Sequence, residues 1–251
     1  MTGASFLIQP APYPMLRRVT RFSPWTLGTV LLALLAATPV VTVVWLAVHP
    51  SDDIWQHLLD TSLLVYLSNT LLLMLGVGVS VLLTGVATAW LVTMCRFPGR
   101  GMFEWLLIFP LAIPAYVIAY AYTDLLEYAG PVQMLLRGLF GWSSPRDYWF
   151  PEIRSLWGAM ILMGVVLYPY VYLLARAAFL EQSVNVLEVS RVLGRGSWRT
   201  FYSISLPAAR PAVAVGVALA LMETLNDYGT VDFFAVRTMT AGLIDVWLGM
   251  G

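Results

Sequence analysis

The stretch that decides the fold is EVSRVLGRGSWRTFYSISLP, which runs from Glu188 to Pro207. It is the only long polar, arginine-rich segment between two apolar spans. The pattern predicts a short helix that ends near Leu193, then a turn and a second short helix. Gly194 suits the position after a helix end, because a left-handed backbone costs least at glycine, and Ser197 suits the N-cap of the second helix. Pro207 fits the first turn of a following helix. We therefore expect a docking element at a membrane surface.

Composition places the chain in a membrane. Of its 251 residues, 59% are apolar and 11% are charged, and the mean hydropathy is +0.78. These values are typical of a polytopic helical membrane protein and exclude an ordinary soluble domain. The formal net charge is zero, so no nucleic-acid partner is expected. Cys95 is the single cysteine, which excludes an internal disulfide and a cysteine-rich metal site.

Apolar runs long enough to cross a bilayer recur along the chain. After a cytoplasmic tail at 1–24 they predict spans at about 25–48, 65–95, 103–124, 155–176 and 207–226. A sixth helix is expected to begin near residue 240 and to remain incomplete. The predicted fold class is thus an all-α polytopic membrane protein, truncated before its sixth helix. Small residues at fourfold spacing in the second span predict close helix packing; they are Gly76, Ser80, Thr84 and Thr88.

The distribution of arginine predicts the orientation. Ten arginines fall on one side of the predicted spans, namely Arg17, Arg18, Arg21, Arg96, Arg100, Arg176, Arg191, Arg195, Arg199 and Arg210. Four fall on the other side, namely Arg137, Arg146, Arg154 and Arg237. Because cytoplasmic loops carry the excess of basic residues, the N-terminus and the polar loop are predicted to be cytoplasmic.

The polar loop resembles the EAA loop of membrane subunits of binding-protein-dependent ABC importers. The resemblance rests on Glu188, Gly194, Ile204, Leu206 and Pro207 at the family spacing. Val189 and Ser190 depart from it, since the family usually has alanine there. The resemblance implies that residues 181–207 dock into a cleft on an ATPase subunit. The coupling residues that it implies are Glu188, Ser190, Arg191, Gly194, Ile204, Leu206 and Pro207. The alternative is an ordinary amphipathic loop packed on its own protein.

Two further stretches resemble permeases of the same class. FPLAIPAYVIAYAYTDLL at 109–126 is similar to the third helix of iron(III)-type importers. ETLNDYGT at 223–230, followed by DFF at 232–234, is similar to iron(III), thiamine and phosphonate permeases. The resemblance implies a MetI-like helical bundle of a type I ABC importer. It also implies an ABC ATPase, a periplasmic substrate-binding protein and a second permease half as partners in the lipid bilayer. That family typically fuses two halves in one chain, so this sequence is expected to be one half or a truncated piece.

Three polar residues near the end of the last predicted span are candidates for the transport pathway. Glu223 lies 13 residues beyond Arg210, which is about 20 Å along a helix in a hydrocarbon core of about 30 Å. An acid at that depth is costly and should face a polar cavity or a partner. Asn226 and Asp227 lie on the same helical face, so all three are predicted to line the outer pathway. Alternatively, Glu223 caps the loop at 229–234.

No arrangement typical of catalysis stands out. His49 and His57 lie on one exterior loop and are interpreted as surface residues, since two ligands do not define a metal site. The phosphate-binding pattern G-x-x-x-x-G-K-[ST] does not occur, so a partner must hydrolyse ATP. No cofactor is expected. We therefore expect a permease subunit in a bacterial inner membrane that imports iron(III), with thiamine, phosphonate or polyamine as alternative substrates. An ATP-independent secondary transporter, for which paired inverted repeats are typical, is the alternative of a different class; a membrane-bound enzyme is the third.

Overall fold

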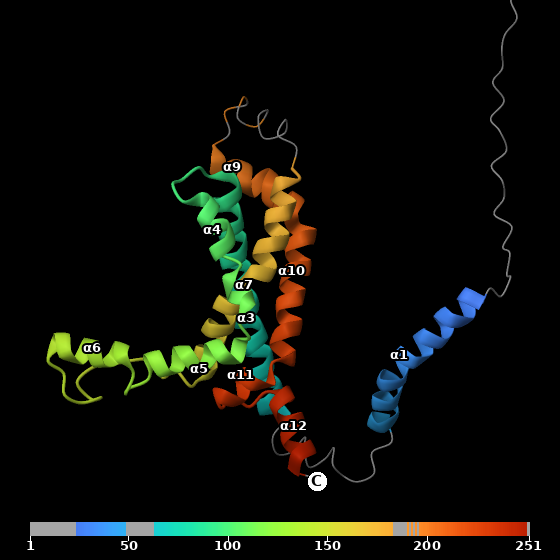
Figure 1. Cartoon of the computed structure of the whole chain (residues 1–251), viewed down its shortest axis with the longest axis horizontal. Coiled ribbons are helices and arrows are strands. Elements are labelled where there is room, and N and C mark those ends of the chain that lie inside the picture. The colour runs from blue at the N-terminus through green and yellow to red at the C-terminus, as the bar shows by residue number, and fades with distance from the viewer. Residues whose placement is uncertain are drawn as a thin grey trace, which may run out of the picture. The chain divides into compact units, whose positions relative to one another are not determined.

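The structure, a computed structural model, describes residues 24–48, 63–182, 190, 192, 194 and 196–249. These residues form helices joined by turns and loops, and no strand occurs among them, which confirms the all-α prediction (Figure 1). The chain divides into two compact units, Met1–His57 and Leu58–Gly251. Four described helices are long and apolar enough to cross a membrane, and a bent helix pair adds a fifth if it is one span.

The first unit contains helix α1, Pro24–Val48, which is apolar around its whole circumference. The hydroxyls of Thr29, Thr38 and Thr42 donate to carbonyl oxygens one turn earlier in the same helix, at 2.8 to 2.9 Å. Because these hydroxyls are satisfied within the helix, α1 presents an apolar exterior that suits lipid.

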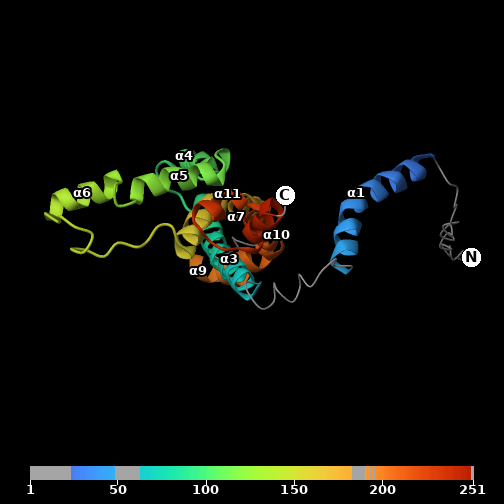
Figure 2. The same ribbon diagram turned by 90° about the horizontal axis from the view of Figure 1, so that it is seen from below.

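Three long helices form the core of the second unit. They are α3 (Leu63–Met94), α7 (Leu156–Leu180) and α10 (Leu206–Asn226). Figures 1 and 2 show them side by side, with α7 in contact with both of the others. Their facing sides carry small and β-branched residues that are fully buried, among them Val77, Val81, Ala175 and Ala209. Ser155 begins α7 as its N-cap, accepting a hydrogen bond from the Gly158 amide at 3.2 Å.

The first two residues of the predicted stripe bring α3 close to α7. Gly76 lies against a methionine of α7, and Ser80 lies against Gly164, where a side chain would have no room. Thr84 and Thr88 instead donate hydrogen bonds within α3, to carbonyl oxygens one turn earlier. The close approach therefore depends on the first two residues of the stripe.

Gly216 brings α10 equally close to the backbone of α7. A Cβ at this position would lie 2.8 Å from the Val171 Cα and 3.1 Å from the Tyr170 carbonyl oxygen. Backbone atoms cannot move aside, so Gly216→Ala should separate the two helices and lower the unfolding free energy by about 1–3 kcal/mol. Unfolding of the purified subunit by sodium dodecyl sulfate in mild detergent measures this loss. Gly138→Ala is the control, because a Cβ there meets nothing within 4 Å; an equal loss in both variants would contradict the packing argument.

The segment at 103–124, predicted as one span, is not one continuous helix. The segment comprises α4 (Arg100–Leu106), the 3₁₀ turn η1 (Phe109–Ala112), α5 (Ala115–Leu126) and α6 (Pro131–Phe140). The direction of the chain changes by 98° between Arg100–Ala112 and Ala115–Phe140. The break occurs because Ile113 is extended, with φ −119° and ψ 130°, as a residue before proline prefers. Pro114 then begins a new helix without donating a hydrogen bond.

The end of the described chain folds back onto α3. After α10 come the short helix α11 (Tyr228–Phe233) and α12 (Met239–Gly249). The Asn69 amide of α3 donates to the Arg237 carbonyl oxygen at 3.0 Å, and Thr70 Oγ1 accepts from the Met239 amide at 2.9 Å. These two bonds fix the start of α12 beside α3.

Candidate coupling surface

The polar loop is described in part. Glu188 and Arg191 lie outside the described residues, whereas Ser190, Gly194 and the segment from 196 onward lie within them. Ser190 is 2% exposed, and its hydroxyl lies 2.8 Å from Thr200 Oγ1. This contact ties the first part of the loop to the second. The contact also explains why serine suits position 190, where the EAA pattern usually has alanine, since the Ser190 hydroxyl has a partner.

Gly194 has the left-handed backbone that the sequence predicts, with φ +73°. A Cβ at this position would meet nothing within 4 Å, so a substitution is resisted by backbone conformation alone. For a residue with a Cβ that conformation costs about 1–2 kcal/mol, and β-branched residues tolerate it least.

The EAA resemblance implies that this loop docks on an ATPase subunit, and on that expectation Gly194→Val should weaken ATPase binding, because the turn would shift to relieve this strain. Gly194→Asn should have a small effect, since asparagine enters the left-handed region most readily after glycine. Co-purification of the ATPase with each variant measures the difference. Equal behaviour of the two variants would show that the turn conformation is not what matters.

The second part of the loop runs into α10 without a break. Helix α9, Ser197–Thr200, is followed by a π-helical turn, η2, at Phe201–Ser205. Pro207 lies in the first turn of α10, the place that suits a proline. π-Helical turns are frequently found at functional sites. Helical structure thus begins ten residues before the span predicted at 207–226.

The end of α7 holds the wide turn in place. Gln182, two residues beyond α7, donates from Nε2 to the carbonyl oxygen of Ser205 at 2.9 Å. Ser205 is fully buried, so this carbonyl group needs an internal partner. The contact links the entrance of the loop directly to its exit.

Three aromatic side chains, Trp90, Phe179 and Phe201, form an aromatic floor beneath the loop. The Trp90 ring of α3 lies 4.7 Å from the Phe201 ring of η2 and 5.6 Å from the Phe179 ring of α7. All three are buried. Aromatic pairs in such edge and tilted geometries add about 0.5–1.5 kcal/mol beyond their burial. The aromatic floor therefore connects the loop to two helices of the bundle.

Sequence reasoning did not identify the aromatic floor. Trp90 and Phe179 lie in the last turns of their helices, and Phe201 begins the FYSIS run. A tryptophan at the end of a membrane helix is typical of a membrane interface, and a single phenylalanine there carries no specific signal. The one available signal was that all three lie at the end of the bundle predicted to be cytoplasmic.

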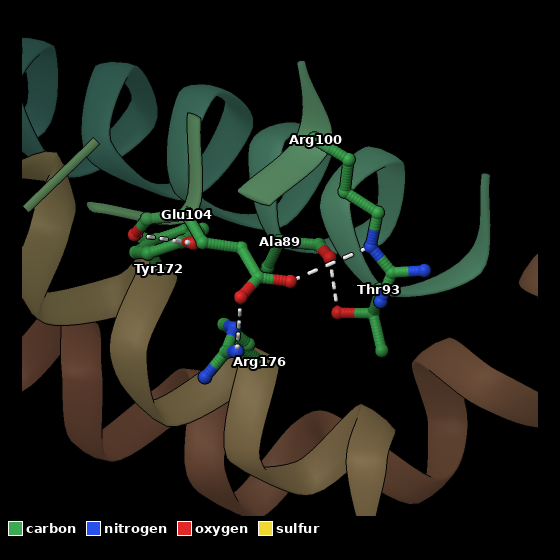
Figure 3. A network of polar contacts seen from close by, with 6 residues as sticks. All are labelled: Ala89, Thr93, Arg100, Glu104, Tyr172 and Arg176. Carbon is green, nitrogen blue, oxygen red and sulfur yellow. Dashed lines mark hydrogen bonds and ion pairs between the residues drawn. The ribbon is translucent and has the colours of Figure 1, made fainter. Parts of the chain in front are cut away.

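A charged network joins α4 to α7 near the same end of the bundle. Figure 3 shows the Glu104 carboxylate between two guanidinium groups, 3.4 Å from Arg100 and 3.2 Å from Arg176. The Tyr172 hydroxyl donates to the Glu104 carbonyl oxygen at 3.3 Å. The charged side chains are about one third exposed, so their ion pairs add little stability. Their effect is to orient α4, whose start was predicted to be cytoplasmic from Arg100.

The predicted pathway residues lie at the opposite end of α10. Glu223 and Asn226 are exposed, and Glu223 forms no ion pair with a residue that the structure describes. Asp227 has a different role, because its carboxylate accepts from the amide and the hydroxyl of Thr230 at 2.9 and 2.6 Å. Asp227 therefore caps α11, which is the role considered for Glu223. No group of three or more metal-ligating side chains comes together within the described part of the chain.

Comparison with known proteins shows a family whose sequences match most of this chain. Residues 81–244 match the family described as "Binding-protein-dependent transport system inner membrane component". The chain is 30% identical to the molybdenum transport system permease protein ModB of Escherichia coli over 151 residues, which cover 60% of this chain and 62% of that protein. It is 28% identical over 153 residues to the sulfate transport system permease protein CysT of Escherichia coli, covering 60% and 51%.

A third relative is the Fe(3+)-transport system permease protein FbpB 2 of Haemophilus influenzae. The identity is 26% over 177 residues, which cover 70% of this chain and 30% of that protein. The chain thus spans less than two thirds of each of these relatives.

Proposed function

Because this chain belongs to the binding-protein-dependent transport system inner membrane components, we propose that it is the permease subunit of an ATP-driven importer in a bacterial inner membrane. Its partners in this proposal are an ABC ATPase, a periplasmic substrate-binding protein and a second permease half. The loop at 181–207 docks on the ATPase from the cytoplasm. The observation that carries the proposal is the contact of Phe201 with both Trp90 and Phe179, which gives the loop a mechanical connection to the bundle.

The proposed mechanism uses this connection. ATP binding must favour one arrangement of the importer through contacts that differ between its states. When the ATPase dimer closes, the loop moves with it. Phe201 transmits the movement to α3 and α7, and the continuous helix from α9 through η2 transmits it to α10. The pathway between two permease halves then changes from inward to outward access.

Reconstitution tests the mechanism against a secondary transporter. The full importer is placed in liposomes with its binding protein outside and ATP inside. Uptake should require ATP and should stop when the ATPase subunit carries a substitution that prevents hydrolysis. Uptake that continues with the disabled ATPase would favour an ATP-independent transporter.

For the substrate we propose iron(III), from the resemblance of 109–126 and 223–234 to iron(III) permeases. The exposed Glu223 carboxylate at the outer end of α10 supports a cation. The names of the relatives make molybdenum, sulfate and 2-aminoethylphosphonate competing substrates. Uptake of radioactive iron, molybdate, sulfate and 2-aminoethylphosphonate by the reconstituted importer decides among them. Uptake of an oxyanion alone would exclude iron(III).

Glu223→Gln gives opposite predictions for a cation and an anion. The substitution retains hydrogen-bonding capacity and removes one negative charge. Since an exposed charge contributes at most about 1 kcal/mol, we expect cation uptake to fall by up to roughly fivefold. Uptake of an anion should rise instead. Glu152→Gln, on an exposed loop residue away from α10, is the control. Unchanged uptake in Glu223→Gln would remove Glu223 from the pathway.

A further inference from the structure

Helix α6 leaves the bundle at a steep angle. The chain turns by 98° after Ala112, and α5 and α6 then extend away from α3, α7 and α10. Both Figure 1 and Figure 2 show this extension to one side of the three long helices. If those helices cross a bilayer, α6 runs roughly parallel to the membrane surface.

The polar side chains of α6 point back toward the protein. Gln133 is 6% exposed, donates to the Leu126 carbonyl oxygen at 2.7 Å and accepts from the Tyr148 hydroxyl at 2.6 Å. Arg137 donates to the Tyr128 carbonyl oxygen at 2.8 Å and lies 4.1 Å from the centre of that ring. The hydrogen-bonding groups of both side chains thus have partners in the loops on either side of α6.

The outward face of α6 is apolar. Leu139 is 71% exposed, and Met134, Leu135 and Phe140 are exposed as well. A helix at a protein–water boundary has the opposite arrangement, with its polar face outward. An apolar outward face is suited to lipid, and a helix that lies in the membrane interface buries its apolar face at the boundary between headgroups and acyl chains.

The outward face of α6 continues into other surfaces suited to lipid. Trp149 is 86% exposed on the following loop, and Trp157 and Ile161 are exposed on the first turns of α7. Between α5 and α7 lies a cavity of about 290 Å³ with almost entirely apolar walls, to which both of these α7 residues contribute. At the end of α6 three rings stack, with Phe140 and Tyr148 4.8 and 4.7 Å from Trp142. Tryptophan and tyrosine are enriched at the interface between a membrane and water.

The tip of the following loop is suited to water instead. Arg146 and Asp147 are exposed there. The backbone amides of Ser143 and Ser144 donate to the Asp147 carboxylate at 2.8 Å and lower its pKa. Asp147 therefore stays charged, and this side of the segment belongs in the aqueous phase.

From these contacts we propose that residues 131–154 form an interfacial arm. The face of α6 with Leu135 and Leu139 is immersed in lipid, while the loop tip with Arg146 stays in water. The base of the arm is fixed by the ion pair of Arg154 with Glu127 at 2.7 Å, and by the Arg154 guanidinium over the Phe233 ring of α11. The arm is assigned to the outer leaflet because the proposed function puts the loop at 181–207 in the cytoplasm; this assignment is the only step that rests on the proposed function.

Spin labels at two positions test the arm in the complete importer in liposomes. In a Cys95→Ala background, one variant carries the label at Leu139→Cys and the matched control carries it at Arg146→Cys. Oxygen, which is concentrated in lipid, should relax the label at position 139 more than a water-soluble nickel complex does. The order should be reversed at position 146. ATP-dependent uptake by both labelled variants shows that the importer is intact.

Each other outcome overturns the proposal. Stronger relaxation by nickel at position 139 would mean that α6 faces water. Protection of position 139 from both reagents would mean that protein covers α6, either the second permease half or the binding protein. Stronger relaxation by oxygen at both positions would mean that the segment has no water-facing side. None of these readings depends on transport, so failure of the proposed function would be seen separately, as loss of ATP-dependent uptake.

Discussion

Replacing Trp90 with alanine should abolish most transport while leaving the ATPase bound and active. Trp90 is the member of the aromatic floor that contacts both Phe179 and Phe201 at close range. Truncating a buried aromatic side chain costs about 3–5 kcal/mol. The remaining contact, between Phe179 and Phe201, supplies only about 0.5–1.5 kcal/mol and cannot replace it. Movement of the loop would then no longer reach α3. We expect uptake per ATP hydrolysed to fall at least about tenfold, the factor that corresponds to 1.4 kcal/mol.

Two further variants make this result specific. Trp105→Ala removes a tryptophan that is 77% exposed near the same end of the bundle, and it should have little effect. Phe201→Leu keeps an apolar side chain and tests the same contact should Trp90→Ala fail to insert. Normal coupling in both Trp90→Ala and Phe201→Leu would show that the aromatic floor carries no signal.

Glu188→Ala should detach the subunit from its ATPase. Glu188 lies outside the described residues, so this expectation rests on its place in the EAA pattern. Loss of one partner from a buried, hydrogen-bonded charge pair at an interface costs about 2–5 kcal/mol, or roughly 30-fold to several thousandfold in affinity. Titration of detergent-purified subunit with ATPase measures the loss directly.

The control for Glu188 is a carboxylate outside the docking loop. Glu152→Ala removes an exposed acid on the loop before α7 and should leave the affinity unchanged. The competing role for Glu188 is an ion pair with Arg191 or Arg195 on the helix surface, which contributes only about 0.2–0.5 kcal/mol. An affinity loss of that size, or none, would contradict docking through Glu188.

The sequence predicts the long apolar helices because their signal is local. Almost all of α3, and α7 up to Arg176, consist of long uncharged runs, and the length of such a run shows that it can cross a bilayer. The conformation of Gly194 was also predictable, because a glycine after a short polar helix has one favoured use. The break at Ile113–Pro114 was not, since hydropathy is continuous through it and proline is tolerated in many membrane helices.

Contacts between distant segments account for the rest. Phe201 meets Trp90 and Phe179 only after the loop has folded back over the bundle. The cap considered for Glu223 is supplied by Asp227, because the Asp227 carboxylate is the one that reaches the amide of Thr230. Both acids lie within one turn of the end of α10, so spacing alone left the two roles open.

The wide turn at Phe201–Ser205 makes the length of this region as important as its composition. A π-helical turn holds one residue more than an α-helical turn, so loss of one residue from Phe201–Ser205 would close it to an α-helical turn with little rotation of the flanking helices. A second deletion would have no such extra residue to remove. Since 3.6 residues complete an α-helical turn, everything before it would rotate about the axis of α10 by about 100°, which would carry Phe201 away from Trp90. Homologous sequences should therefore be at most one residue shorter between Phe201 and Pro207.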